Sequence, residues 1–153
     1  MKKYYIAYGS NLNTAQMEMR CPDAVPVAVT ELKNYKLVFQ GRRNNAHANV
    51  IPAKGHTVPV VIWQISRRDE MSLDVYEGVR GGYYYKDYLP VDIDGKTCLA
   101  LIYIMTPHGY GLPTDGYLYT IVEGYRDFNL DARILNSAVL DAQSKTFQNA
   151  VSM

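Results

Sequence analysis

Strand-like segments fill most of the first two thirds of this 153-residue chain, and their order limits the possible folds more than any other feature. Residues 24–40 are rich in residues that favour strands, and VPVVIWQI at 58–65 is apolar enough for a strand buried on both faces. YYYKDYLPVDI and TCLALIYIM meet around Asp94-Gly95, which is a pair typical of tight hairpin turns. Residues 3–8 and 48–52 also have strand patterns. We therefore expect an α+β fold with a small, mostly antiparallel, barrel-like β-sheet.

Short helices are predicted between these strands. Asn13 and Gln16 have the spacing of a capping box, which would begin a short helix after the first strand. The segment Ser66–Asp69 has the same form, and the helix that it begins should end at Gly78. Glycine is the usual residue just beyond a helix C-terminus because it adopts the left-handed conformation without strain.

The last part of the chain has helical patterns. Apolar stripes over residues 117–125 and 134–139 predict two C-terminal helices. Residues 143–153 have no strong pattern, so we expect a single domain over residues 1–142 and a loose C-terminal tail over residues 143–153.

Composition excludes several classes of function. Lys and Arg total 16 and Asp and Glu total 15, so there is no broad charge that would attract a nucleic acid or an anionic membrane. The N-terminal residues are too soon polar for a signal peptide, and no apolar run is long enough to span a membrane, so we expect a cytoplasmic protein. The two cysteines and three scattered histidines predict neither a disulfide scaffold nor a metal site. The 14 tyrosines suit a polar-lined pocket or a wet interface; a base-stacking surface would normally have a basic groove as well.

Gly9-Ser10-Asn11 is the first candidate site, because it lies between a predicted strand and a predicted helix. Backbone N–H groups at such a position are free and favour a carboxylate or a phosphate. The motif is neither a P-loop nor a dinucleotide-binding fingerprint. Taken alone, this segment is also compatible with an ordinary turn.

Glu77 is the second candidate, because it falls on the last turn of its helix, where the helix dipole disfavours a negative charge. Its neighbours Val75, Tyr76 and Val79 are apolar, and burial among them would raise the pKa of the carboxyl group. A glutamate with a raised pKa can accept and return protons near neutral pH. A solvated glutamate with no role is the alternative.

Taken together, YGSNL after a strand, the helix end LDVYEG, a glycine-tyrosine strand start and a distal helix with a tyrosine resemble the γ-glutamylcyclotransferase family. The resemblance covers roughly residues 4–128. It implies a cofactor-independent enzyme without a metal, which releases 5-oxoproline from a γ-glutamyl compound. In that reaction the α-amine of the substrate attacks its own γ-carbonyl group and expels the attached amine or amino acid.

The resemblance also implies roles for individual residues. Glu77 would be the catalytic acid and base, and the substrate-binding residues would be Tyr8, Gly9, Ser10, Asn11, Leu12, Tyr84 and Tyr117. The partner would be a small γ-glutamyl molecule, and neither a nucleic acid nor a membrane. The alternative function is a non-catalytic binding module on the same fold. The sequence leaves open the leaving group and the oligomeric state.

Overall fold

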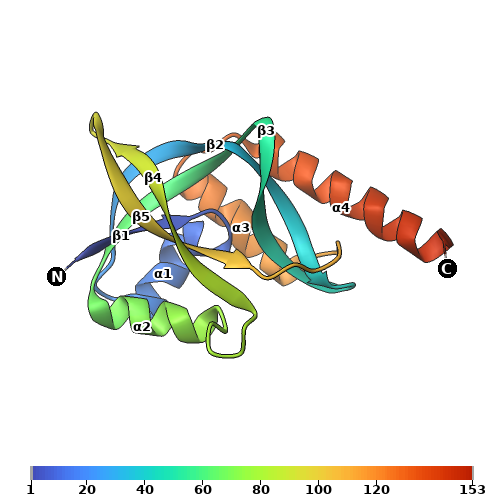
Figure 1. Cartoon of the computed structure of the whole chain (residues 1–153), viewed down its shortest axis with the longest axis horizontal. Coiled ribbons are helices and arrows are strands. Elements are labelled where there is room, and N and C mark those ends of the chain that lie inside the picture. Colours follow the sequence, from blue (N-terminus) through green and yellow to red (C-terminus); the bar gives the residue numbers. More distant parts are fainter. Residues whose placement is uncertain (1, 153) are drawn as a thin grey trace.

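The computed structural model describes the backbone of residues 2–152 and the side chains of residues 2–147 (Figure 1). Five strands form one sheet in the order β2-β3-β1-β5-β4, and every neighbouring pair is antiparallel except β1 and β5. The strands are β1 (Lys3–Ala7), β2 (Val25–Arg42), β3 (Asn45–Ile65), β4 (Tyr84–Ile93) and β5 (Lys96–Met105). This confirms the α+β fold and its mostly antiparallel sheet. The sheet is not a closed barrel, because β2 and β4 remain its two edges.

The hairpin of β2 and β3 is longer than the sequence predicts. The segments predicted at 48–52 and 58–65 belong to one strand, β3, which continues through the residues between them. The register shifts between Lys33 and Tyr35, where Asn34 has a φ of 64° and its side chain accepts a hydrogen bond from the Gly55 N–H (3.1 Å). The hairpin can bend at this irregularity, and both strands continue past it.

The two predicted helix starts are present. Asn13 begins α1 (Thr14–Arg20), and its side chain accepts a hydrogen bond from the Gln16 N–H (2.9 Å). The Gln16 side chain bonds back to the Ser10 carbonyl group, so only half of this capping box forms. Ser66 begins α2 (Arg67–Tyr76), where both bonds of the capping box with Asp69 are formed.

Two helices follow the sheet, as predicted. They are α3 (Asp115–Asp127) and α4 (Ala132–Ser152), and α4 extends beyond the sheet toward the C-terminus (Figure 1). The expectation of a loose C-terminal tail over residues 143–153 is corrected, because residues 143–152 continue α4. Met153 lies outside the described residues. Over the described residues, no helix has both the length and the apolarity that crossing a membrane requires.

Helix α3 packs directly against the turn that follows β1. That turn is a short 3-10 helix, η1 (Ser10–Leu12), and Gly124 of α3 touches it. A Cβ atom on Gly124 would lie 2.6 Å from Leu12 Cβ and 2.8 Å from the Asn13 nitrogen. The absence of a side chain at Gly124 therefore sets how closely α3 approaches η1.

We expect Gly124→Ala to destabilise the protein by about 1–3 kcal/mol, because α3 and η1 must separate to admit the methyl group. Gly116→Ala is the matched control on the same helix, since a Cβ atom there meets nothing within 4 Å. The control should be neutral or should stabilise the protein by up to about 1 kcal/mol. Urea unfolding measures both variants, and equal stability of the two would contradict the close packing at Gly124.

Candidate active site

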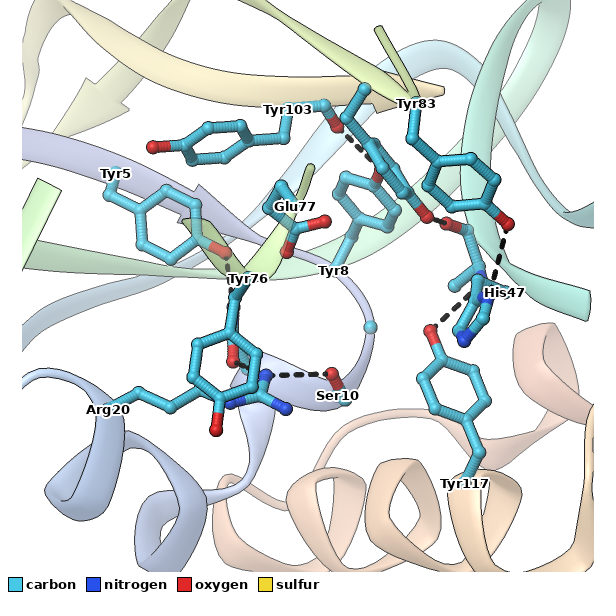
Figure 2. A pocket seen from close by; sticks show the side chains of 14 residues that line it. Tyr5, Tyr8, Ser10, Arg20, His47, Tyr76, Glu77, Tyr83, Tyr103 and Tyr117 are labelled. Carbon is cyan, nitrogen blue, oxygen red and sulfur yellow. Dashed lines mark hydrogen bonds between the residues drawn. The ribbon is translucent and has the colours of Figure 1, made fainter. Parts of the chain in front are cut away.

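A cavity of about 200 Å³ opens where η1, the end of α2 and the start of β4 meet. Half of its lining residues are tyrosines, and they come from segments that are distant in the sequence (Figure 2). The lining residues are Tyr5, Tyr8, Gly9, Ser10, Asn11, Arg20, His47, Ala48, Tyr76, Glu77, Tyr83, Tyr84, Tyr103 and Tyr117.

All but one of the predicted site residues lie in this lining. The exception is Leu12, which is fully buried and packs under Gly124 instead of facing the cavity. Its N–H group is also occupied, because it donates to the Gly9 carbonyl group (3.0 Å) in the 3-10 turn. The candidate anion loop therefore contains Gly9, Ser10 and Asn11, and Leu12 supports it from the core.

The N–H groups of Gly9, Ser10 and Asn11 have no hydrogen-bond acceptor within the described residues. A Cβ atom on Gly9 would lie 3.0 Å from Ala48 Cβ, so the loop lies directly against β3. Three free donors at a cavity wall can bind an anion such as a carboxylate.

Asn11 fixes the loop through its side chain. Its amide nitrogen donates to the Tyr5 hydroxyl oxygen (2.9 Å), and its amide oxygen accepts from Arg20 Nη1 (2.7 Å). Arg20 Nη1 also lies 3.4 Å from Ser10 Oγ. The guanidinium carbon is 3.7 Å from the centre of the Tyr76 ring, so the ring covers one face of the cation.

Glu77 is the C-cap residue of α2, and its side chain points into the cavity between tyrosine rings (Figure 2). Gly78 follows it with a φ of 61° and turns the chain toward β4, as the sequence predicts. Within the described residues, no group donates a hydrogen bond to the carboxylate. Burial raises the pKa of Glu77 to about 7, and the positive charge of Arg20 opposes this rise.

The burial of Glu77 depends only partly on its neighbours in sequence. Val75 is 81% exposed and does not line the cavity, whereas Tyr76 lines it although it is 60% exposed. The other tyrosines of the cavity wall come from other parts of the chain, so tertiary packing also excludes water from the carboxyl group.

Four of the tyrosine hydroxyls of the cavity bond to the protein in two different ways. Tyr8 donates to the Tyr103 carbonyl group (2.6 Å), and Tyr84 donates to the Ala48 carbonyl group (2.7 Å). Tyr5 and Tyr117 instead accept hydrogen bonds, from Asn11 and from the Ala48 N–H group (3.0 Å). The protons of Tyr5 and Tyr117 therefore remain available for a ligand.

Tyr83 and Tyr84 both line the cavity, whereas alternation along a strand predicts that Tyr83 and Tyr85 share a face. Tyr83 does not follow this alternation, because β4 begins only at Tyr84 and Tyr83 belongs to the preceding turn. Tyr85 points away from the cavity and is 45% exposed.

His47 is another lining residue that the sequence does not identify. It lies in β3 and not in a loop, 3.1 Å from the Tyr83 hydroxyl oxygen, and its ring meets that of Tyr117 edge to face. Burial lowers its pKa, which favours the neutral ring. Over the described residues, no group of three His, Cys, Asp or Glu side chains is arranged to hold a metal ion.

Sequence reasoning also missed Tyr5, Arg20, Tyr76 and Tyr103. Their positions in the cavity depend on contacts between distant segments, such as the pairing of Tyr5 with Leu101 across β1 and β5. The only available signal was the closeness of Tyr5 and Arg20 in sequence to the Gly9–Asn11 turn.

Comparisons with known proteins by sequence and by structure agree with one another. Residues 5–125 match the family model described as gamma-glutamyl cyclotransferase, AIG2-like. A gamma-glutamylcyclotransferase from Mus musculus is 33% identical over 134 residues, which are 82% of this chain and 71% of that protein. The gamma-glutamylcyclotransferase from Homo sapiens is 31% identical with the same shares covered. A solved structure named gamma-glutamyl cyclotransferase superposes with a TM-score of 0.81 and 27% identity, over 90% of this chain and 86% of that one.

Proposed function

The chain belongs to the gamma-glutamyl cyclotransferase, AIG2-like family and is an enzyme of this type; we propose that it releases 5-oxoproline from a γ-glutamyl amino acid or a γ-glutamyl amine. The observation that carries the proposal is the unpaired carboxyl group of Glu77, with its raised pKa, in the cavity that also contains the free N–H groups of Gly9–Asn11.

The γ-glutamyl head group would bind with its α-carboxylate against the Gly9–Asn11 loop. In this orientation the α-ammonium group and the γ-carbonyl carbon would lie in the interior of the cavity near Glu77. Because nucleophile and electrophile belong to one molecule, holding the substrate in a folded conformation removes much of the entropic barrier to ring closure.

Glu77 would remove a proton from the α-ammonium group. An α-amino group titrates near ~8 and an ordinary glutamate near ~4.3, so this transfer would cost roughly 5 kcal/mol in water. With the pKa of Glu77 at about 7, the difference shrinks to about one pKa unit, or roughly 1.4 kcal/mol. The position of the carboxyl group thus makes it an effective base.

The freed amine then attacks the γ-carbonyl carbon, and a C–N bond forms that closes the five-membered ring. The available hydroxyl protons of Tyr5 and Tyr117 are suited to stabilise the negative charge that develops on the carbonyl oxygen. Protonated Glu77 returns its proton to the leaving nitrogen as the original amide bond breaks. The ring nitrogen then loses its second proton to Glu77, which passes it to the released amine. The products are 5-oxoproline and the amine in its ammonium form, and Glu77 is again ionised.

Incubation with a panel of γ-glutamyl amino acids and γ-glutamyl amines, monitored for 5-oxoproline, tests this proposal. Release of 5-oxoproline from at least one class is expected. Binding of γ-glutamyl compounds without release of 5-oxoproline would favour the alternative function, a non-catalytic binding module.

We expect Gly9→Val to weaken binding of a γ-glutamyl dipeptide by at least about tenfold, or about 1.4 kcal/mol. A side chain at this position meets Ala48 Cβ and the Tyr117 hydroxyl group, so it displaces β3 or occupies the anion loop. Calorimetry in the Glu77→Gln background measures affinity without turnover. Gly109→Val is the control, since a Cβ atom at Gly109 meets nothing within 4 Å; equal affinity of both variants would remove the Gly9 loop from the binding site.

A further inference from the structure

Arg20 is a cation in the cavity wall that forms no salt bridge within the described residues. Glu77 is the acidic residue of the same cavity wall; the positive charge of Arg20 lowers its pKa, but the two side chains do not pair. The Nε atom of Arg20 is buried and has no hydrogen-bond partner within the described residues. A partly buried guanidinium group without a directly bonded carboxylate is costly, and an anionic ligand would reduce that cost.

The guanidinium group is held in place beside the candidate anion loop. Its Nη1 atom bonds to Asn11 and approaches Ser10, and the Tyr76 ring stacks on one face. These contacts are all with neutral groups, so they fix the position of the cation without neutralising it. Figure 2 shows Arg20 and Ser10 together below Glu77, with His47 and Tyr117 to their right.

On the basis of the proposed function, we propose that Arg20 selects substrates with a free α-carboxylate on the γ-glutamyl group, by supplying the positive charge that pairs with it. The loop N–H groups can donate hydrogen bonds to a carboxamide oxygen as well as to a carboxylate oxygen, so they discriminate between the two less than a full positive charge does. A guanidinium group distinguishes the two, because a hydrogen bond between charged partners is worth about 1.5–3 kcal/mol and a neutral one about 1 kcal/mol. Arg20 would therefore be the specificity determinant for the head group and leave the choice of leaving group to other residues.

The test compares two substrates that differ only in this group: a γ-glutamyl dipeptide with a free α-carboxylate on its glutamyl residue, and the same compound with an α-carboxamide. We expect the wild-type enzyme to prefer the acid in kcat/KM by about 2-fold to 30-fold, which corresponds to the difference of about 0.5–2 kcal/mol between the two kinds of hydrogen bond. In Arg20→Gln the rate with the acid should fall while the rate with the amide changes little, so that the ratio approaches one. Arg20→Lys should restore part of the preference, because it keeps the charge but not the planar fork.

Arg133→Gln is the control, since Arg133 is exposed at the start of α4 and pairs only with Asp131. This variant should retain the wild-type ratio of kcat/KM for the acid to kcat/KM for the amide. If Arg20→Gln lowered the rates with both substrates by the same factor, Arg20 would only hold Asn11 in place, and the inference would be overturned. A wild-type enzyme that does not distinguish acid from amide would overturn it as well.

Binding separates this inference from the proposed function. The affinity of both compounds is measured by calorimetry for Glu77→Gln with and without Arg20→Gln. A preference for the acid that disappears with Arg20 supports the inference even where the wild-type enzyme releases no 5-oxoproline. Release of 5-oxoproline without such a preference sustains the proposed function and overturns the inference.

Discussion

Glu77→Gln is expected to lower kcat for 5-oxoproline release by about 10²-fold to 10⁴-fold, the usual contribution of a general acid and base. The amide has nearly the same shape as the carboxyl group but can neither accept the proton of the α-ammonium group nor return it to the leaving nitrogen. KM and substrate affinity should change much less, because the loop and Arg20 are intact. Steady-state rates with a γ-glutamyl dipeptide measure the change in kcat, and calorimetry measures the affinity.

Glu18→Gln is the matched control for this prediction. Glu18 lies on α1 close to the site in sequence, but its side chain is exposed and does not line the cavity. It should retain the wild-type kcat. Residual activity of Glu77→Gln within a few-fold of the wild type would remove Glu77 from the proton transfers.

The second large effect concerns stability: Glu77→Gln should stabilise the folded protein at pH 8 by up to about 3 kcal/mol. The pKa of Glu77 is about 7 in the folded state against 4.5 for the ordinary side chain, because burial disfavours the charged form. As the pH rises from about 4.5 to about 7, the unfolded chain loses this proton before the folded protein does. The wild type therefore loses stability across this window, and glutamine, which does not titrate, avoids the loss.

Urea unfolding of both proteins at intervals from pH 4 to pH 8 measures this effect. The gain in unfolding free energy should be small at pH 4, grow through pH 5–7 and level off above pH 7. A constant difference between the two proteins at every pH would mean that the carboxyl group titrates at its ordinary value. In that case, holding the carboxylate of Glu77 in the cavity would not lower the stability of the wild-type protein.

The two predictions test one feature by independent measurements. Activity depends on whether the carboxyl group reaches the substrate, whereas stability depends only on its environment in the unliganded protein. If the stability effect appears without the kinetic effect, Glu77 is a buried carboxyl group that the reaction does not use.

Local sequence determined the elements that frame the site. The caps at Asn13 and Ser66, the left-handed Gly78 and the hairpin turn at Asp94-Gly95 are all present where the sequence places them. Each of these features is formed by residues that are only a few positions apart, so it can be recognised without knowledge of the fold. The turn after β1 belongs to the same class, because Gly9-Ser10-Asn11 ends a strand and begins the short helix η1.

Only the tertiary structure decided what surrounds these features. The continuity of β3 depends on a bend shared with β2, and the open sheet depends on which strands remain edges. The desolvation of Glu77 depends on cavity tyrosines from other elements, and its neighbour Val75 contributes nothing to the cavity lining.

The role of Arg20 is likewise visible only in the tertiary structure. The sequence identifies it only as the end of a short helix, whereas the fold brings its unpaired charge to the wall that Glu77 shares with the Gly9–Asn11 loop. A cap or a turn is a contact within one segment, and the sequence of that segment can specify it. A cavity is a space between segments, so its shape and its charges exist only once distant parts of the chain have packed together.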